Sequence, residues 1–279
     1  MQFGLNLPNF GYLGDVRTQL ELALEAEAAG WDGVFVWDHV NFPGMRPHAD
    51  PWITLGVIAA QTKRLILGTA VTPVARRRPT KLAQEILTLD ALADGRFVFG
   101  AGNGLFQGEF EHLGDEGDLR VRAEMLDEGL ELLQSLWTDE DVAFEGRHYH
   151  AKTQGFGPPA GKRKIPIWIG ATWPKRKPVL RATRYDGIIP ILDPYTEHIS
   201  PEQVHEIRTL ATEQRGPAEG FDIVIPQMGG TGDPTADRRR MLEFADAGAT
   251  WILDAAFPGG EALDAILERV RRGPPQLDA

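Results

Sequence analysis

Residues 65–101 have the sequence LILGTAVTPVARRRPTKLAQEILTLDALADGRFVFGA, in which a helix-length segment separates two apolar runs. The runs, 65–71 and 96–101, are nearly continuous in apolar residues, which is typical of strands covered on both faces of a parallel sheet. Between them, leucine and isoleucine recur at helical spacing over 80–93, and Pro79 stands where the first turn of a helix tolerates proline. This stretch therefore predicts a strand–helix–strand unit of a parallel sheet.

The same unit recurs from one end of the chain to the other. The other predicted strands cover residues 3–7, 33–37, 165–169, 187–191, 223–225 and 251–253. The other predicted helices cover residues 15–29, 118–137, 174–185, 201–214, 234–247 and 261–272. Two shorter runs, 142–144 and 148–150, follow the helix 118–137, which is helix 4 of the barrel because it comes after the fourth strand, and they predict a small surface hairpin.

Eight strands, each followed by a helix or a helix-length segment, predict an α/β fold of the (β/α)8 TIM barrel type, for which about 250 residues are typical. A doubly wound open sheet is the alternative, but such a sheet seldom needs eight repeats. No linker rich in Pro, Gly or Ser divides the chain, so residues 1–279 are predicted to form a single domain.

The composition limits the partners of the protein. A formal net charge of −11 argues against a nucleic-acid partner, because binding phosphates requires a basic face. No run approaches the roughly 20 apolar residues that cross a bilayer, and the N-terminus lacks the pattern of a secretory signal. The absence of cysteine excludes disulfides, thiolate metal sites and a cysteine nucleophile. We therefore expect a cytoplasmic protein that binds neither nucleic acid nor membrane and acts on a small organic molecule.

Asp38-His39, directly after the second predicted strand, is the sharpest candidate for chemistry. In a TIM barrel the catalytic groups lie at the C-terminal ends of the strands, and an imidazole beside a carboxylate suits proton transfer. The structural alternative is that Asp38 caps the following loop and His39 is a partly exposed residue with its hydrogen bonds satisfied. Four aromatic residues are expected near this end of the barrel, where they could line a pocket: Trp37, Phe106, Trp168 and Trp173.

A glycine turn follows the fourth predicted strand. Gly100, Gly102 and Gly104 carry no Cβ, so the backbone could approach a ligand closely, with Asn103 beside it. The turn does not complete the dinucleotide pattern G-x-G-x-x-G, because Leu105 interrupts it. A ring or a phosphate packed against this turn is more plausible than a dinucleotide, and a tight turn without any ligand is the alternative.

A candidate anion site follows the fifth predicted strand. Gly170, Ala171 and Thr172 precede a predicted helix N-terminus, where free backbone N–H groups and the helix dipole favour negative charge. Arg176 follows these residues closely in sequence. The arginines 76–78, after the third strand, could contact the same anionic ligand, whereas solvated loop charge is the alternative for any one of these basic clusters.

His148 and His150 lie on one face of a predicted strand, at a spacing that metals can use. They belong to the peripheral hairpin, away from the expected mouth of the barrel. The first strand also lacks the paired histidines expected of a metal-dependent barrel hydrolase, so no metal site is predicted.

Several sequence segments, taken together in this order and spacing, form a pattern that is specific for one protein family. They are 30–39 (GWDGVFVWDH), 65–73 (LILGTAVTP), 89–102 (LDALADGRFVFGAG), Glu109-Phe110, 126–130 (LDEGL), the hairpin 144–149 and 165–170 (IPIWIG). On these segments the chain resembles the luciferase-like monooxygenase superfamily, barrel enzymes that use reduced FMN or the deazaflavin F420.

The resemblance implies a cofactor whose ring packs against the third strand, where members commonly have a non-prolyl cis peptide, here at Ala70-Val71. The cofactor could be F420 or FMN, with F420 preferred because the Asp38-His39 pair looks more like the F420-dependent branch. The residues expected to bind the cofactor are Asn6, Thr69, Ala70, Val71, Gly102, Asn103, Gly170, Ala171, Thr172 and Arg176. Of these, Gly170, Ala171 and Thr172 would hold the phosphate.

The resemblance also implies a reaction, in which the cofactor ring exchanges a hydride with a small organic substrate or activates oxygen. His39 would be the acid/base near the reactive edge of the ring, and Asp38 would orient it. A homodimer is the expected assembly. Two alternatives remain open: a flavin-binding barrel without catalysis, and a metal-dependent barrel hydrolase.

The chain departs from the family pattern in two places. The F420-dependent sugar-phosphate dehydrogenases carry a glutamate just past the glycine turn, where this chain has Leu105-Phe106. The acidic residue of those enzymes is therefore not supplied in the same way here. For this reason we do not transfer their substrate to this chain. The chain also has little sequence between the sixth and eighth strands for a mobile lid, which favours hydride transfer over oxygenation.

Overall fold

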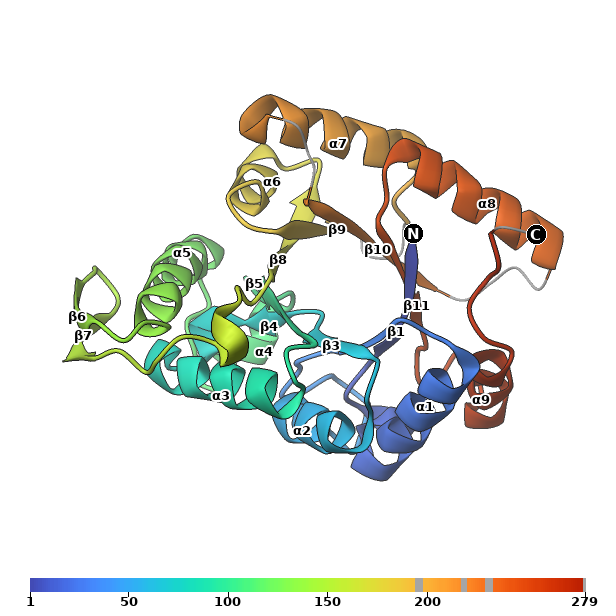
Figure 1. Ribbon diagram of the computed structural model, residues 1–279, viewed down its shortest axis with the longest axis horizontal. Coiled ribbons are helices and arrows are strands. Elements are labelled where there is room, and N and C mark those ends of the chain that lie inside the picture. Colours follow the sequence, from blue (N-terminus) through green and yellow to red (C-terminus); the bar gives the residue numbers. More distant parts are fainter. Residues whose placement is uncertain (194–197, 217–219, 229–232, 278–279) are drawn as a thin grey trace.

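A closed ring of parallel strands forms the centre of the molecule (Figure 1), in a computed structural model that describes residues 1–193, 198–216, 220–228 and 233–277. The strands of the ring are β1 (Gln2–Leu7), β2 (Gly33–Val36), β3 (Ile66–Thr69), β4 (Thr72–Pro73), β5 (Phe97–Gly102), β8 (Ile167–Trp173), β9 (Gly187–Leu192), β10 (Asp222–Met228) and β11 (Trp251–Ala255). Pairing of β3 with β5 closes the ring, and β1 lies between β2 and β11.

The predicted (β/α)8 barrel is confirmed, because β3 and β4 together occupy the place of the third predicted strand. The run 65–71 is interrupted at the Ala70-Val71 peptide, which is cis as the resemblance implied. After the interruption, β4 continues in parallel along β5, with Thr72 opposite Ala101.

Helices surround the ring on its outer side (Figure 1). They are α1 (Val16–Ala29), α2 (Pro51–Gln61), α3 (Pro79–Leu92), α4 (Gln107–Glu111), α5 (Leu119–Leu136), α6 (Arg176–Ala182), α7 (Pro201–Arg215), α8 (Pro234–Ala247) and α9 (Leu263–Arg271). Side chains cap several of these helices by accepting hydrogen bonds from backbone N–H groups of the first turn. Asp15 caps α1, Asp50 caps α2, Asp118 caps α5, and Ser200 begins α7 with a full capping box.

The interior of the ring is filled by large aromatic side chains. Phe35 stacks on Trp168, with ring centroids 5.1 Å apart, and Trp251 packs edge-on against both rings. Gly68 is required here, because a Cβ at this position would lie 2.7 Å from both the Phe35 ring and the Val98 carbonyl oxygen. Trp168 therefore belongs to the barrel core, and the expectation that it lines a pocket at the mouth is wrong.

Two helices, α2 and α4, were not predicted. Helix α2 has the sequence PWITLGVIAAQ, which is apolar around most of its circumference and therefore lacks the one-sided pattern of an amphipathic helix. Helix α4 has only five residues, too few for a periodic pattern.

The hairpin follows α5, which corresponds to the predicted helix 118–137, as predicted, but its second strand is shifted. The strands are β6 (Asp141–Glu145) and β7 (His150–Gln154), so His148 and Tyr149 lie in the turn. The backbone N–H groups of Arg147, His148 and Tyr149 donate to the Glu128 carboxylate on α5 instead of to the opposite strand. This helix side chain, far away in sequence, displaces the turn.

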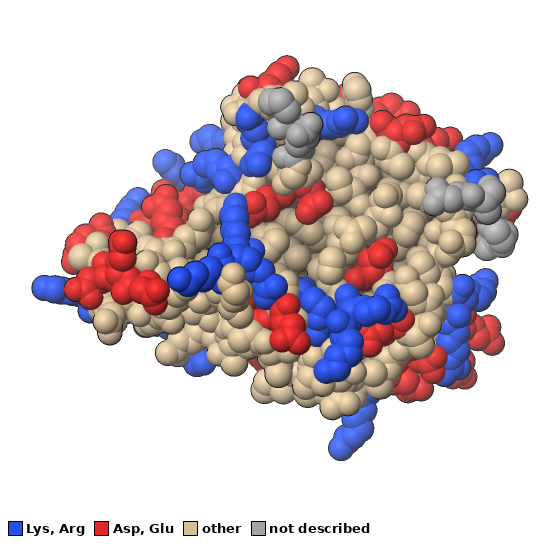
Figure 2. Space-filling model, in the orientation of Figure 1, with Lys and Arg blue, Asp and Glu red and all other residues tan. Residues whose placement is uncertain are grey.

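The surface carries both signs of charge. On the face shown in Figure 2, basic and acidic side chains are interspersed and do not form one field of a single sign. In the part of the chain that the structure describes, no helix is both long enough and apolar enough to cross a membrane.

Candidate functional site

His39 lies in the loop after β2, at the C-terminal end of the barrel strands, and its carboxylate partner is Glu109. The Nδ1 atom of His39 is 2.9 Å from the Glu109 Oε2 atom, and the Glu109 side chain is only 3% exposed. Because an ionised carboxylate can only accept hydrogen bonds, the imidazole must donate its Nδ1–H, which leaves Nε2 of the neutral ring as an acceptor. The pair holds one imidazole tautomer ready for proton transfer.

Glu109 is itself held by several donors. Its Oε1 accepts hydrogen bonds from the backbone N–H groups of Val40 and Asn41, and the guanidinium of Arg76 lies 3.4 Å away. Burial alone would raise the pKa of Glu109, but the hydrogen bond and charge of His39, the charge of Arg76 and the N–H of Asn41 together lower it to about 2. The carboxylate is therefore ionised at neutral pH.

Asp38 does not orient His39, and the role given to it by the sequence analysis is corrected. Its carboxylate accepts hydrogen bonds from Arg77 at 2.8–3.1 Å and lies 3.4 Å from the indole N–H of Trp52. The two neighbouring side chains contact different partners, Arg77 for Asp38 and Glu109 for His39, so adjacency in sequence does not pair them. Asp38 is 4% exposed and anchors the loop to the segment after β4.

Asn9, after β1, fixes the backbone of this same loop. Its Nδ2 donates to the carbonyl oxygens of His39 and Ala49, and its Oδ1 accepts from the N–H of His39. The backbone that carries the imidazole is thus held from the neighbouring strand end, which limits how far His39 can move.

Aromatic rings surround the His39 imidazole. Ring centroids within 6 Å of the imidazole centroid belong to Phe10, Trp37, Phe42 and Phe106, at 5.8, 5.9, 5.5 and 5.8 Å. Phe257 completes the set, because its ring lies 5.9–6.4 Å from three of these rings. We call these five residues the aromatic cluster. Its members come from the loops after β1, β2, β5 and β11, which converge at the mouth of the barrel.

Several of the residues expected to bind the cofactor are brought together around Val71. A Cβ on Gly102 would lie 2.4 Å from a Val71 methyl group, and a Cβ on Gly170 would lie 3.1 Å from it. The hydroxyl of Thr69 donates to the Gly100 carbonyl oxygen at 2.7 Å, which ties β3 to β5. Ala70 and Val71 are half-buried above the aromatic core of the ring, so they form an apolar floor at its mouth.

The other residues of that set have different surroundings. The Oδ1 of Asn6 accepts a hydrogen bond from the Trp37 indole at 2.7 Å, so Asn6 supports the aromatic cluster. Asn103 donates to the carbonyl oxygen of Leu119 at the start of α5, and Arg176 is exposed at the first position of α6. Of these, Asn6 is tied to the surroundings of His39, whereas Asn103 is turned toward α5.

Gly170, Ala171 and Thr172 do not stand at a helix N-terminus, and that expectation is corrected. They lie inside β8 and are opposite Ile189, Pro190 and Ile191 of β9. Helix α6 begins only at Arg176, because a turn with a cis Trp173-Pro174 peptide intervenes. The sequence between the sixth and eighth strands, in which a lid was considered, falls partly outside the described residues, at 194–197, 217–219 and 229–232.

The two hairpin histidines contact different carboxylates. Nε2 of His148 lies 3.2 Å from Glu124, and Nδ1 of His150 lies 3.4 Å from Glu145. Among the described residues, no group of three or more histidine, aspartate or glutamate side chains could hold a metal ion.

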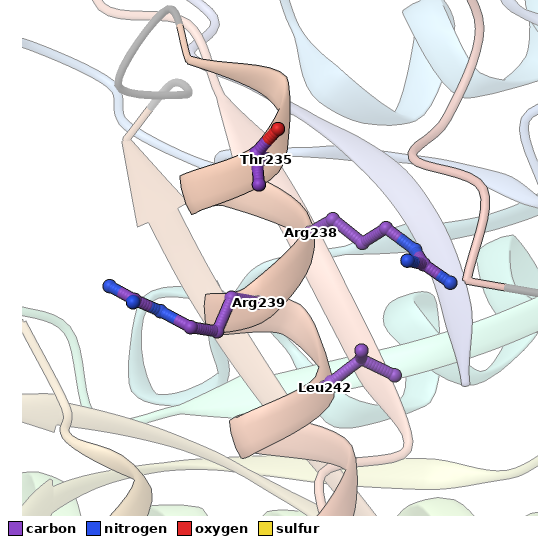
Figure 3. Close-up of a pocket in the computed structure, with 4 residues that line it drawn as sticks. All are labelled: Thr235, Arg238, Arg239 and Leu242. Atoms are coloured by element: carbon purple, nitrogen blue, oxygen red, sulfur yellow. The ribbon is translucent and has the colours of Figure 1, made fainter. Parts of the chain in front are cut away.

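A surface pocket of about 350 Å³ lies along helix α8, lined by Thr235, Arg238, Arg239 and Leu242 (Figure 3). Arg238 already donates to the carbonyl oxygen of Leu277, and Arg239 projects from another side of the helix. None of these residues belongs to the loops that carry His39, so this pocket is not the candidate site.

Glu109 belongs to the candidate site, but the sequence alone did not single it out. Glu109 was noted only as part of the family pattern. Acidic residues are frequent in this segment, where Glu111, Asp115 and Glu116 follow closely, so nothing local distinguishes Glu109. The chain geometry that turns Glu109 toward His39 comes from α4, which the sequence did not predict.

Curated relatives are named for F420-dependent chemistry. An F420-dependent glucose-6-phosphate dehydrogenase of Nakamurella multipartita is 38% identical over 175 residues, which are 61% of this chain and 49% of that protein. A protein of the same name from Microbacterium testaceum is 35% identical over 176 residues, with the same two shares. The match thus spans about half the length of these relatives. Their names agree with the class of enzyme predicted from the sequence, an oxidoreductase that works on F420 or FMN.

Solved structures confirm the fold. An F420-dependent secondary alcohol dehydrogenase in complex with an F420-acetone adduct has a TM-score of 0.81 at 18% identity, covering 100% of this chain and 99% of that one. An F420-dependent tetrahydromethanopterin reductase of Methanopyrus kandleri has a TM-score of 0.76 at 17% identity, covering 98% of both chains. The family model of the luciferase-like monooxygenases matches residues 1–269, nearly the whole sequence. The resemblance found in the sequence is therefore confirmed, and the chain belongs to the luciferase-like monooxygenase family.

Proposed function

We propose that this protein is an oxidoreductase that binds F420, in preference to FMN, and exchanges a hydride between this cofactor and a small organic substrate. The observation that carries the proposal is the buried pair of His39 Nδ1 and Glu109 Oε2, 2.9 Å apart at the mouth of the barrel. The names of the curated relatives support the choice of F420.

The residues at the mouth fit a flat cofactor ring. Ala70 and Val71 form an apolar floor, and the absence of side chains at Gly102 and Gly170 lets the ends of β5 and β8 close around Val71. A side chain at Gly102 would collide with Val71 and push this floor apart. These residues would hold the ring, and Thr172 and Arg176 remain the proposed contacts of its phosphate.

His39 would hold the proton that moves with the hydride. The cofactor, when bound, supplies the hydride chemistry, and the protein supplies position and proton transfer. With Nδ1–H donated to Glu109, the Nε2 atom is free to accept the proton of a substrate hydroxyl, or in the protonated state to donate one to a carbonyl oxygen. Glu109 stabilises the protonated imidazole by its negative charge.

The proposal is tested by titrating the purified protein with F420 and with FMN separately, following the fluorescence or absorbance of each ring. We expect micromolar binding of F420 and weaker binding of FMN. Tighter binding of FMN would instead direct the assays toward monooxygenation with a reductase and oxygen.

Two further outcomes would refute the proposal. F420 binding without turnover for any alcohol or carbonyl compound would favour a flavin-binding barrel without catalysis. Binding of neither cofactor, together with metal in the purified protein, would favour a metal-dependent hydrolase. The predicted homodimer and cytoplasmic location stay predictions, and light scattering of the purified protein tests the dimer.

A further inference from the structure

We infer that the substrate of this site is an uncharged, largely apolar alcohol or carbonyl compound whose ring or hydrocarbon part packs within the aromatic cluster. The inference rests on the proposed function and narrows it. It also separates this protein from a sugar-phosphate dehydrogenase, the activity named for its curated relatives.

The surface around the imidazole consists mainly of aromatic rings. The rings of Phe10, Trp37, Phe42 and Phe106 all have their centroids within 6 Å of the His39 centroid. Four of the five residues in the cluster are half-buried, and only Phe10 is fully buried, so ring surface is available to a ligand. Aromatic rings attract apolar and aromatic groups by area and by edge-to-face contact.

Stacking and hydrogen bonds hold the aromatic cluster in place. The Phe10 and Phe42 rings stack with centroids 4.2 Å apart, and Asn6 fixes the Trp37 indole by a hydrogen bond. The backbone N–H of Phe42 donates to Nε2 of His48 at 2.8 Å, which closes the loop that carries it. A rigid aromatic wall loses little conformational entropy when it binds a ligand.

Basic side chains are scarce in the loops that carry the aromatic cluster. The loops of the cluster, residues 8–15, 37–50, 103–106 and 256–262, contain one lysine or arginine in their sequence, Arg46, and its side chain is exposed. Three basic side chains from other loops at this end of the barrel face carboxylates: Arg76 faces Glu109, Arg77 faces Asp38, and Lys175 faces Asp193. Burying a phosphate dianion among aromatic rings without a paired cation is strongly unfavourable.

Within the described part of the cluster, the His39 imidazole offers the substrate a polar contact, whereas the Trp37 indole N–H already donates to Asn6. The Nε2 atom of His39 can accept from a hydroxyl or, when protonated, donate to a carbonyl oxygen. A molecule with one such oxygen and an apolar remainder satisfies this atom and the surrounding rings together.

The test compares two probes on the full-length protein, 1-phenylethanol and glucose 6-phosphate. Affinities are measured by quenching of tryptophan fluorescence, both without cofactor and with saturating F420, and turnover is followed with F420 as acceptor. We expect 1-phenylethanol to bind at least about tenfold more tightly than glucose 6-phosphate. Equal or tighter binding of glucose 6-phosphate would overturn the inference.

Variants connect the result to the cluster. We expect Phe42→Leu to weaken binding of 1-phenylethanol roughly 3- to 10-fold, as for the loss of an aromatic contact. Phe144→Leu, in the peripheral hairpin, is the matched control and should leave the affinity unchanged. Equal effects of both variants would also overturn the inference.

These measurements distinguish failure of the proposed function from failure of the proposed substrate class. If F420 does not bind but 1-phenylethanol binds without it, the proposed function fails and the substrate class stands. If F420 binds and glucose 6-phosphate is the better ligand, the proposed function stands and the substrate class fails.

Discussion

At the scale of single residues, His39 combines a fixed tautomer with a position at the mouth of the barrel. If it transfers the proton, His39→Ala should lower kcat by about 10²- to 10⁴-fold, the usual contribution of a general acid or base. The Kd for F420 should change by less than about threefold, because the residues proposed to bind the ring are elsewhere. Steady-state kinetics and a cofactor titration measure the two effects, and an unchanged kcat would remove His39 from the mechanism.

The lowered pKa of Glu109 leads to a second prediction at this scale, which concerns the stability of the protein in acid. Its pKa is lowered from 4.5 to about 2 in the folded protein, so the ionised carboxylate stabilises the fold above about pH 4.5. This contribution is lost progressively as the pH falls toward 2. We therefore expect Glu109→Gln to be less stable than wild type at neutral pH, and the difference to shrink between pH 5 and 2.

Urea denaturation at a series of pH values measures this difference. The matched control is Glu124→Gln, which removes a carboxylate that contacts a histidine, His148, outside the candidate site. A difference between wild type and Glu109→Gln that is constant from pH 7 to pH 2 would contradict the assignment.

At the scale of elements, the loop after β2 is secured from its neighbours. The Asp38 carboxylate makes a bidentate contact with Arg77, after β4, and is almost fully buried. Asp38→Asn keeps the shape but removes the buried charge partner of the guanidinium and leaves it only Glu85, 3.9 Å away, so it should cost about 3 kcal/mol. The melting temperature should fall by roughly 5–10 °C for a chain of this size.

The control for this prediction is an exposed ion pair. Arg239 and Glu243 lie 3.8 Å apart on the surface of α8, where such pairs contribute less than about 1 kcal/mol. Glu243→Gln should therefore leave the melting temperature nearly unchanged. If both variants melt at the same temperature, Asp38 does not anchor the loop.

The elements themselves were largely predictable, and the contacts between them were not. Strands and amphipathic helices follow from local periodicity, so their order and most of their bounds agree with the structure. Helix α2 is apolar on most sides, and the turn at His148 is set by Glu128 from a distant helix, so neither leaves a local signal. Asp38 and His39 could be predicted to follow the second strand at the mouth of the barrel, but their partners Arg77 and Glu109 come from other loops and depend on tertiary structure.

At the scale of the whole molecule, the ring of strands brings together loops from opposite ends of the chain. Phe10 follows the first strand and Phe257 follows the last, yet their ring centroids are 5.9 Å apart. The aromatic cluster therefore exists only when the ring is closed. The closure could be predicted from the number of strands, but the aromatic side chains that meet across it could not, since Trp168 was expected at the mouth and lies in the core.

The position of β1 between β2 and β11 has a consequence for synthesis and aggregation. Until residues 251–255 have left the ribosome, β1 and β10 are open edges whose backbone N–H and C=O groups can pair with another chain. A chain that ends before Trp251 should therefore aggregate, whereas one that ends after α9 should stay monodisperse, as light scattering would measure. A monodisperse chain without β11 would contradict this. Until its last strand is made, the nascent chain therefore exposes two strand edges to neighbouring chains that are being translated from the same messenger RNA.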